Sequence, residues 1–187
     1  MNLVTSNIRQ RPIRTLISVV SVALGVTLVM LFTGFTRGMS NDMQRRATNW
    51  RAEILFTRPG AMELTSSTPS VSTGYVERLK RIEGVAEAIP VITYVSAGKA
   101  GFGFELIDGV DWDPFARMNQ MQILEGRAPQ ANTEVIIDET RKKEKKTLDV
   151  GGTIRLFGNR DYQIVGVFAP QSGARVKMTL NAMQDVL

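Results

Sequence analysis

The sequence predicts an α+β protein with an N-terminal transmembrane helix, a helical stalk and a mixed α/β extracytoplasmic domain. Three observations predict this order. A long uncharged apolar stretch lies near the N-terminus, apolar residues at helical spacing follow it, and short strand and helix patterns then interleave. The interleaving shows no regular βαβ rhythm, which favours α+β over a parallel α/β sheet.

The apolar stretch runs from Leu16 to Phe35 and contains no charged residue. As a helix it would be about 30 Å long, which matches the hydrocarbon core of a bilayer. A soluble helix would carry a polar stripe. A signal peptide would have a shorter apolar region that ends at a small-residue cleavage site. Neither pattern is clear here, so the sequence predicts a retained transmembrane helix.

The net charge of +5 and the pI near 9.8 suggest a nucleic-acid binder, but the position of the charge argues against one. The first 37 residues contain four basic side chains and no acidic one, whereas the rest of the chain is almost neutral. The basic excess therefore flanks the membrane segment. The four membrane-flanking residues are Arg9, Arg11, Arg14 and Arg37.

Arginines lie on both sides of the span, so the Lys/Arg count does not decide its orientation. Because a long C-terminal region translocates largely regardless of its charge, we expect a cytoplasmic N-terminus and an extracytoplasmic main domain.

Small residues on the span suggest contacts with other membrane helices. Spacings of three and four place them on one face, or in a G-x-x-x-G pattern at the membrane edge, where helix backbones can approach closely. Gly and Ser are also common in membrane helices, so this alternative stays open. The helix-packing candidates are Ser18, Ser21, Gly25, Gly34 and Gly38.

The segments on either side of the span also have helical patterns. Residues 1–15 carry a weak apolar face that Pro12 interrupts, which indicates an interfacial helix followed by a bend. After Phe35 the helix is expected to continue as a stalk over residues 37–50, with an apolar stripe that needs a partner. The stripe consists of Met39, Met43, Ala47 and Trp50.

Short patterns predict the elements of the main domain. Helices are expected at 76–82, ended by Gly84, and at 139–147. The second of these carries the basic run E-T-R-K-K-E-K-K, which is interpreted as a solvated helix face rather than a lipid or nucleic-acid site. Strands are expected at 53–56, 91–95, 102–108, 134–137, 153–157, 162–168 and 175–180, with a hairpin between the fifth and sixth.

Composition excludes several kinds of chemistry. The chain has no cysteine and no histidine, so Cys/His zinc sites, disulfides, cysteine nucleophiles and Ser-His-Asp triads cannot occur. The acids of D-G-V-D-W-D could form a metal or acid–base site, but ordinary turn chemistry is the preferred interpretation. No catalytic, cofactor-binding or metal-binding residue is predicted. The acids in question are Asp108, Asp111 and Asp113.

Seven short motifs in order resemble a known family, the permease subunits of MacB/FtsX-like ABC transporters with their MacB-type periplasmic core domain. The match covers nearly the whole chain. The motifs are N-I-R-Q-R-P-I-R-T-L with V-A-L-G-V, V-E-R-L-K-R-I-E-G-V-A-E-A-I-P-V, I-D-G-V-D, L-E-G-R-A-P, E-V-I-I-D-E, L-D-V-G-G-T-I-R-L and Y-Q-I-V-G-V-F.

The resemblance implies a dimeric, non-enzymatic permease of the bacterial inner membrane, without cofactors, that works with a separate cytoplasmic ABC ATPase. Such permeases convert ATP-driven dimerisation into movement of external domains for export, extraction or partner activation. The expected partners are the ATPase, a second permease copy, membrane lipid and a periplasmic adaptor or substrate protein, with no nucleic acid. The ATPase contact would lie in regions absent from this chain.

The implied organisation assigns a role to each part of the chain, with the C-terminal part of the core domain and the later membrane helices missing. The parts are a cytoplasmic interfacial helix (1–15), a transmembrane helix (16–36), a stalk (37–50) and the periplasmic core domain (51–187). The alternative hypothesis is a single-span anchored binding or adaptor protein. A soluble nucleic-acid binder is the least favoured hypothesis.

Overall fold

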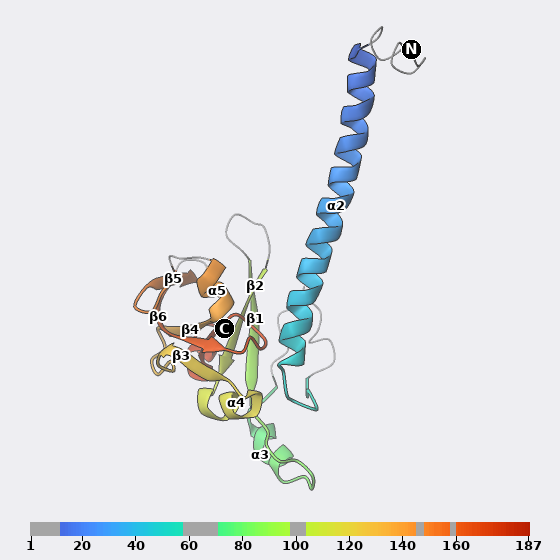
Figure 1. Ribbon diagram of the computed structural model, residues 1–187. Helices are drawn as coiled ribbons and strands as arrows, with labels where there is room; N and C mark the ends of the chain where they lie inside the picture. The colour runs from blue at the N-terminus through green and yellow to red at the C-terminus, as the bar shows by residue number, and fades with distance from the viewer. Residues whose placement is uncertain (1–11, 58–70, 98–103, 145–147, 158–159) are drawn as a thin grey trace. The chain divides into compact units, whose positions relative to one another are not determined.

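Helix α2 runs from Pro12 to Thr48 without a break. The structure is a computed structural model that describes residues 12–57, 71–97, 104–144, 148–157 and 160–187 (Figure 1). The chain divides into two units, Met1–Gln44 and Arg45–Leu187, so the last turn of α2 belongs to the second unit. Arg9, Arg11 and most of the expected interfacial helix lie outside the described residues.

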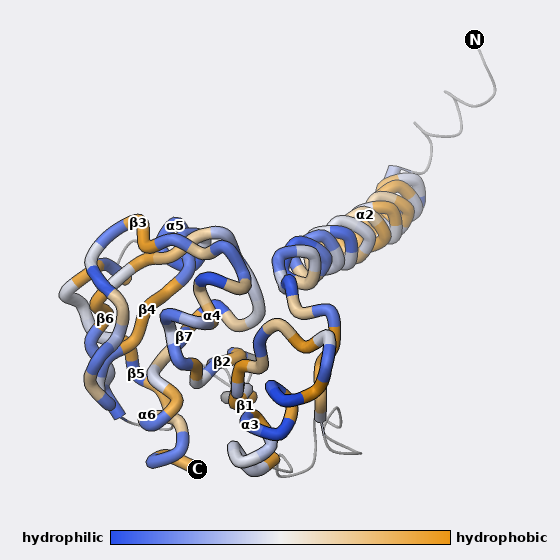
Figure 2. Tube along the Cα trace, turned by 90° about the horizontal axis from the view of Figure 1, so that it is seen from below, coloured by the Kyte–Doolittle hydropathy of each residue, from blue (hydrophilic) through white to orange (hydrophobic). Residues whose placement is uncertain are grey.

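Helix α2 has the properties of a membrane span. Within the described part of the chain, it alone is long and apolar enough to cross a bilayer, and none of its residues is buried. Figure 2 shows the apolar colouring along much of the helix and hydrophilic residues in its last turns. The hydroxyls of Ser18, Thr27 and Thr36 donate to carbonyls four residues earlier, at 3.1, 2.8 and 2.8 Å. These bonds satisfy the hydroxyls where lipid offers no partner.

The second unit contains a mixed sheet of seven described strands, in the order β1-β2-β7-β4-β6-β3, with β5 paired to β6 (Figure 1). Pairs β2–β7 and β4–β6 are parallel and the other pairs are antiparallel. The strands are β1 (Val91–Ala97), β2 (Phe104–Val110), β3 (Gln122–Gly126), β4 (Glu134–Asp138), β5 (Thr153–Leu156), β6 (Arg160–Ala169) and β7 (Val176–Thr179).

Four short described helices accompany the sheet, and two of them supply core side chains. Helix α6 adds Ala182 and Met183 to one hydrophobic cluster, and α4 adds Phe115 and Ala116 to another. The helices are α3 (Gly74–Lys80), α4 (Trp112–Asn119), α5 (Glu139–Glu144) and α6 (Leu180–Gln184).

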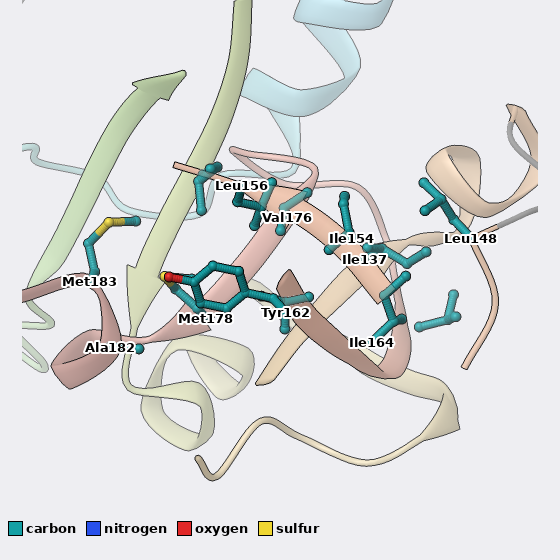
Figure 3. Packing of buried hydrophobic residues seen from close by; sticks show 13 residues of the cluster. Ile137, Leu148, Ile154, Leu156, Tyr162, Ile164, Val176, Met178, Ala182 and Met183 are labelled. Atoms are coloured by element: carbon teal, nitrogen blue, oxygen red, sulfur yellow. The ribbon is translucent and has the colours of Figure 1, made fainter. Parts of the chain in front are cut away.

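The two clusters lie on opposite faces of the sheet because successive strand residues point to opposite sides. On β4, Val135 and Ile137 belong to the cluster with α6, whereas Ile136 belongs to the cluster with α4. Figure 3 shows the first of these, where Ile137, Ile164 and other side chains from neighbouring strands pack together. Both faces of the central strands are therefore covered, which explains why β4 reads as an apolar run.

Most expected elements of the main domain are confirmed. Strands occur at 91–97, 104–110, 134–138 and 176–179, and β5 pairs with β6 as an antiparallel hairpin. The helix expected near 76–82 is α3, and Gly84 follows it with a φ of +90°. The helix expected at 139–147 is described as α5 up to Glu144, and residues 145–147 lie outside the described residues.

One expected strand is wrong, and three elements were not expected. Residues 53–56 form no strand, and Ile54 remains 85% exposed. Their apolar pattern fits a strand, but none of the described strands pairs with them, and a strand needs a hydrogen-bonded neighbour. Strand β3 and helices α4 and α6 were not expected. Helix α4 does have helical periodicity, with buried Trp112, Phe115, Ala116 and Asn119, but each of the three elements has eight residues or fewer and gives only a short local signal.

Candidate functional site

Three side chains form a polar row across β1, β2 and β7. Thr93 is the register partner of Asp108, which is in turn the register partner of Lys177. Partners in register on neighbouring strands point to the same face of a sheet. Thr93 Oγ1 donates to Asp108 Oδ1 at 2.8 Å, and Lys177 Nζ donates to Asp108 Oδ2 at 2.9 Å. One carboxylate therefore links three strands.

Lys177 places a cation in an apolar setting. Its side chain is 0% exposed and that of Asp108 is 1% exposed. The ammonium lies 4.9 Å from the ring centre of Phe115 and 5.4 Å from that of Phe168, which adds cation–π attraction. The backbone N–H of Ala174 also donates to Asp108 Oδ2, at 2.9 Å. These contacts offset the hydration that the two ions lose on burial.

The loop before β7 passes next to this pair at Gly173. A Cβ at Gly173 would lie 2.7 Å from Asp108 Oδ2 and 2.7 Å from Trp50 Cζ3, and the residue has a φ of +61°. Side chains are strained at this φ and have no space here. Glycine therefore leaves room for the Asp108 carboxylate and the Trp50 ring, which both lie where a side chain at this position would begin.

The chain at the end of α2 binds the same loop. We call residues 46–51 the junction segment, and all of them belong to the second unit. Arg46 Nη1 donates to the Gly173 carbonyl at 3.2 Å, and Asn49 Nδ2 donates to the Gln171 carbonyl at 2.6 Å. Two side chains of the junction segment thus hold two backbone carbonyls of one loop.

Arg46 also binds a buried carboxylate. Its Nη2 lies 3.2 Å from Asp138 Oδ2, at the end of β4, and Asp138 is fully buried. Burial raises the pKa of Asp138, and the Arg141 N–H, which donates to Oδ1 at 2.6 Å, together with the Arg46 charge, opposes the rise. Arg46 therefore joins the end of α2 to the central sheet through a charged contact of low exposure.

The junction segment has a third set of contacts, with α4. The Trp50 ring packs edge-on against Phe115, with 6.0 Å between ring centres. The Arg51 N–H donates to Asn119 Oδ1 at 3.1 Å, and Asn119 Nδ2 donates to the Phe115 carbonyl at 3.0 Å. Phe115 thus contacts Trp50 on one side and the Lys177 ammonium on another, which connects the segment to the buried pair.

These groups hold segments of chain together through paired charges, backbone carbonyls and ring contacts. Within the ranges that the structure describes, no group of three His, Cys, Asp or Glu side chains could hold a metal ion. The expectation of no catalytic, cofactor or metal residue stays a prediction. The arrangement is suited to a mechanical connection between the end of α2 and the sheet.

The turn interpretation of the acidic cluster is wrong for Asp108, which lies inside β2 and pairs with a buried lysine. Asp111 and Asp113 fit the interpretation better, because they lie at the N-cap and in the first turn of α4. Sequence reasoning missed Lys177 altogether. The sequence feature that could have indicated it is a single lysine between two apolar residues, Val176 and Met178, in an expected strand.

The basic run is only partly a solvated face. Arg141 is mostly buried in an ion pair with Glu105, whereas Lys143 is exposed and pairs with Glu139 at 2.7 Å. Lys142 is intermediate in exposure, and its ammonium bridges the carboxylates of Glu125 and Asp149 at 2.5 and 2.9 Å. Because α5 lies against the sheet, one of its sides carries structural ion pairs.

The helix-packing candidates all lie on α2, where the structure brings no other part of the described chain to the glycines. A Cβ at Gly25, Gly34 or Gly38 would meet nothing within 4 Å. Arg14 and Arg37 also lie on α2. Nothing in the ranges that the structure describes accounts for these glycines, and their role in helix packing stays a prediction.

Comparison with known proteins places the chain in a family. The model of the MacB-like periplasmic core domain matches residues 15–187. The extracellular domain of the noncanonical ABC-type transporter YknZ from Gram-positive bacteria is 18% identical, with a TM-score of 0.48 over 70% of this chain and 73% of that one. A domain assigned to a permease protein from Porphyromonas gingivalis is 19% identical, with a TM-score of 0.43 over 55% of this chain.

This chain covers about half of the Porphyromonas gingivalis chain, 49%. No curated protein matches the sequence. The family implies a membrane-anchored protein with an extracytoplasmic domain. Since the family model covers most of the residues, the chain belongs to the MacB-like periplasmic core domain family.

Proposed function

We propose that this chain is part of a permease subunit that transmits ATP-driven motion from a cytoplasmic ATPase to its extracytoplasmic domain, for export, extraction or partner activation. One observation carries the proposal: α2 continues to Thr48, so its last turn already contains Arg46, which binds Asp138 and the Gly173 carbonyl. Arg46 is therefore itself a residue of the helix. A displacement of the helix end would therefore reach the sheet.

The bonds of the junction segment are of a kind that can carry such a displacement. Hydrogen bonds that involve a charged group contribute about 1.5–3 kcal/mol each. Arg46 donates such bonds to a carboxylate and to a carbonyl, at 3.2 Å each. Because they end on a strand and on the loop before another strand, motion of Arg46 would act on the sheet at two points.

The orientation and assembly of the subunit are also part of the proposal. The N-terminus lies in the cytoplasm, the main domain is extracytoplasmic, and the small residues of α2 pack against membrane helices of this or another permease copy. Gly25, Gly34 and Gly38 support this assignment, since residues without a side chain allow helix backbones to approach closely. A periplasmic adaptor or substrate protein would bind the main domain.

Orientation can be tested with single cysteines, because the chain contains none of its own. Glu83 is exposed in the main domain, and Thr5 precedes the span. In intact spheroplasts a membrane-impermeant maleimide should label Glu83→Cys at once and Thr5→Cys only after lysis. The reverse pattern would overturn the orientation.

Transmission can be tested at Ser172, which is fully buried in the loop that Arg46 holds. In nanodiscs that contain the chain and its ATPase, maleimide labelling of Ser172→Cys should become faster during ATP hydrolysis than with ADP. Adding Arg46→Ala should remove the difference between the nucleotides. Arg45→Ala, which removes the same charge from an exposed neighbour, should preserve it.

The alternative hypothesis, a single-span binding or adaptor protein, predicts that no ATPase co-purifies with the chain. It also predicts equal labelling with ATP and ADP in every variant. That result would contradict the transmission proposal.

A further inference from the structure

The buried ion pair lies directly beneath the junction segment. A Cβ at Gly173 would lie 2.7 Å from both Asp108 Oδ2 and Trp50 Cζ3, so the carboxylate and the Trp50 ring lie close to the same point. Phe115 contacts both the Trp50 ring and the Lys177 ammonium. Trp50 therefore lies next to groups that contact each ion.

Hydrogen bonds contribute to holding the segment in this position. They include the Arg46 bonds to Asp138 and the Gly173 carbonyl, the Asn49 bond to the Gln171 carbonyl and the Arg51 N–H bond to Asn119. Trp50 itself is only half-buried, and Arg51 is exposed. The segment is thus attached by hydrogen bonds that water can replace, and not by a deeply buried apolar core.

The physical cost of detachment is lowered by the ions underneath. Burying Asp108 and Lys177 removes two charges from water, which costs hydration free energy. Their mutual contacts offset that cost only when the geometry is good. If Trp50 and the loop at Gly173 move away, both ions regain hydration. An apolar core in the same place would gain nothing from exposure to water, so it would oppose detachment more strongly.

We propose that the junction segment forms a releasable latch over the Asp108–Lys177 pair, closed by Arg46 and opened with the help of hydration of the two ions. The latch rests on the proposed function for its purpose, because motion of α2 would be the signal that opens it. In the closed state the pair is dry and the loop 171–174 is held. In the open state Trp50 and the loop are accessible to solvent.

The latch can be measured without any ATPase, through the fluorescence of Trp50. The chain has two tryptophans, so Trp112→Phe leaves Trp50 as the only one. Acrylamide quenching of the full chain in detergent micelles then reports how exposed Trp50 is. Arg46→Ala should increase the quenching constant about twofold as the open population grows, whereas Arg45→Ala should leave it unchanged.

The role of hydration is tested by neutralising the pair in the Arg46→Ala background. Asp108→Leu with Lys177→Met should return the quenching constant toward that of the parent, because the open state then gains no ion hydration. If this combination fails to fold, as judged by circular dichroism, Asp108→Asn with Lys177→Gln should give the same direction.

Two results would overturn the latch. One is equal quenching of Trp50 in the Arg46→Ala and Arg45→Ala chains. The other is quenching in the Arg46→Ala background that stays high after the pair is neutralised. Because neither measurement involves nucleotide, failure of the latch is distinguishable from failure of ATP-driven transmission, which the labelling of Ser172→Cys reports.

Discussion

Asp108 and Lys177 are register partners on the parallel strands β2 and β7, and their charged groups meet at 2.9 Å with almost no exposure to solvent. The pair lies on the face of the sheet that α4 covers, since Lys177 contacts the rings of Phe115 and Phe168. The carboxylate accepts from Thr93 Oγ1, Lys177 Nζ and the Ala174 N–H. One ion pair thus organises three strands and one loop.

Removing one partner of this pair should be much more harmful than removing both. Lys177→Met leaves a buried carboxylate without its cation, and such a change costs about 3–5 kcal/mol. Lys177→Met combined with Asp108→Leu should cost less than the sum of the two single changes. Urea unfolding of the full chain in detergent, followed by circular dichroism, measures the unfolding free energy of the parent, the two single variants and the double variant. Additive effects would show that the ions are not coupled.

Glu134 should make the domain sensitive to acid. Hydrogen bonds from Arg127 at 2.5 and 2.8 Å, and from the Gln130 N–H at 2.9 Å, lower the pKa of Glu134 from 4.5 to about 2. In the unfolded chain this carboxyl takes up a proton at higher pH than in the folded one. Its contribution to stability is therefore complete above pH 4.5 and disappears as the pH falls toward 2.

Glu134→Gln should consequently flatten the pH dependence of the unfolding free energy in that window, and lower stability at neutral pH by about 1–3 kcal/mol. Urea titrations at a series of pH values measure both effects. Gln130→Ala keeps the backbone donor and should retain the parent profile. An unchanged slope in Glu134→Gln would contradict the assignment.

Gly126 and Gly166 are register partners where β3 meets β6, and neither should accept a side chain. A Cβ at Gly166 would meet the backbone oxygens of Glu125 and Arg127, which cannot move aside as a side chain can. Gly166→Ala should therefore cost about 1–3 kcal/mol. Gly74→Ala, where the added atom makes an ordinary 3.5 Å contact, serves as the control and should be close to neutral. Thermal melts of the two variants decide this.

Gly25→Leu should weaken assembly in the membrane without affecting insertion. A Cβ at Gly25 meets nothing within 4 Å in the described part of the chain, and under the packing proposal the leucine side chain would obstruct a contact with another membrane helix. Crosslinking yield between copies that carry Ser40→Cys measures assembly, and carbonate extraction checks insertion. Ala23→Leu, on another side of α2, is the matched control. Equal crosslinking in both variants would remove the packing assignment.

Much of the fold was predictable because local patterns report local structure. The apolar length of Leu16–Phe35 predicted a helix that the structure extends to Thr48, and alternation predicted β2 and the β5–β6 hairpin. The segment 53–56 has a similar apolar pattern and is not a strand. Its sequence could not show that no strand lies alongside it.

The candidate site was largely unpredictable. Asp108 was interpreted as turn chemistry because the sequence D-G-V-D-W-D contains small and acidic residues next to one another. Its burial depends on Lys177, which lies 69 residues away, and Arg46 lies 92 residues from Asp138. No periodicity in either neighbourhood points to the other.

The sequence by itself determined the membrane helix, the class of the domain and the order of motifs that the family shares, because these follow from the length, polarity and spacing of residues close together in the chain. The tertiary structure decided which charges meet. The parallel pairing of β2 with β7 places Asp108 opposite Lys177, and the return of the loop at Gly173 places Arg46 beside Asp138. Such contacts depend on strand order and register. These bring together residues that are far apart in the sequence, whereas a local pattern involves only residues that are close together in it.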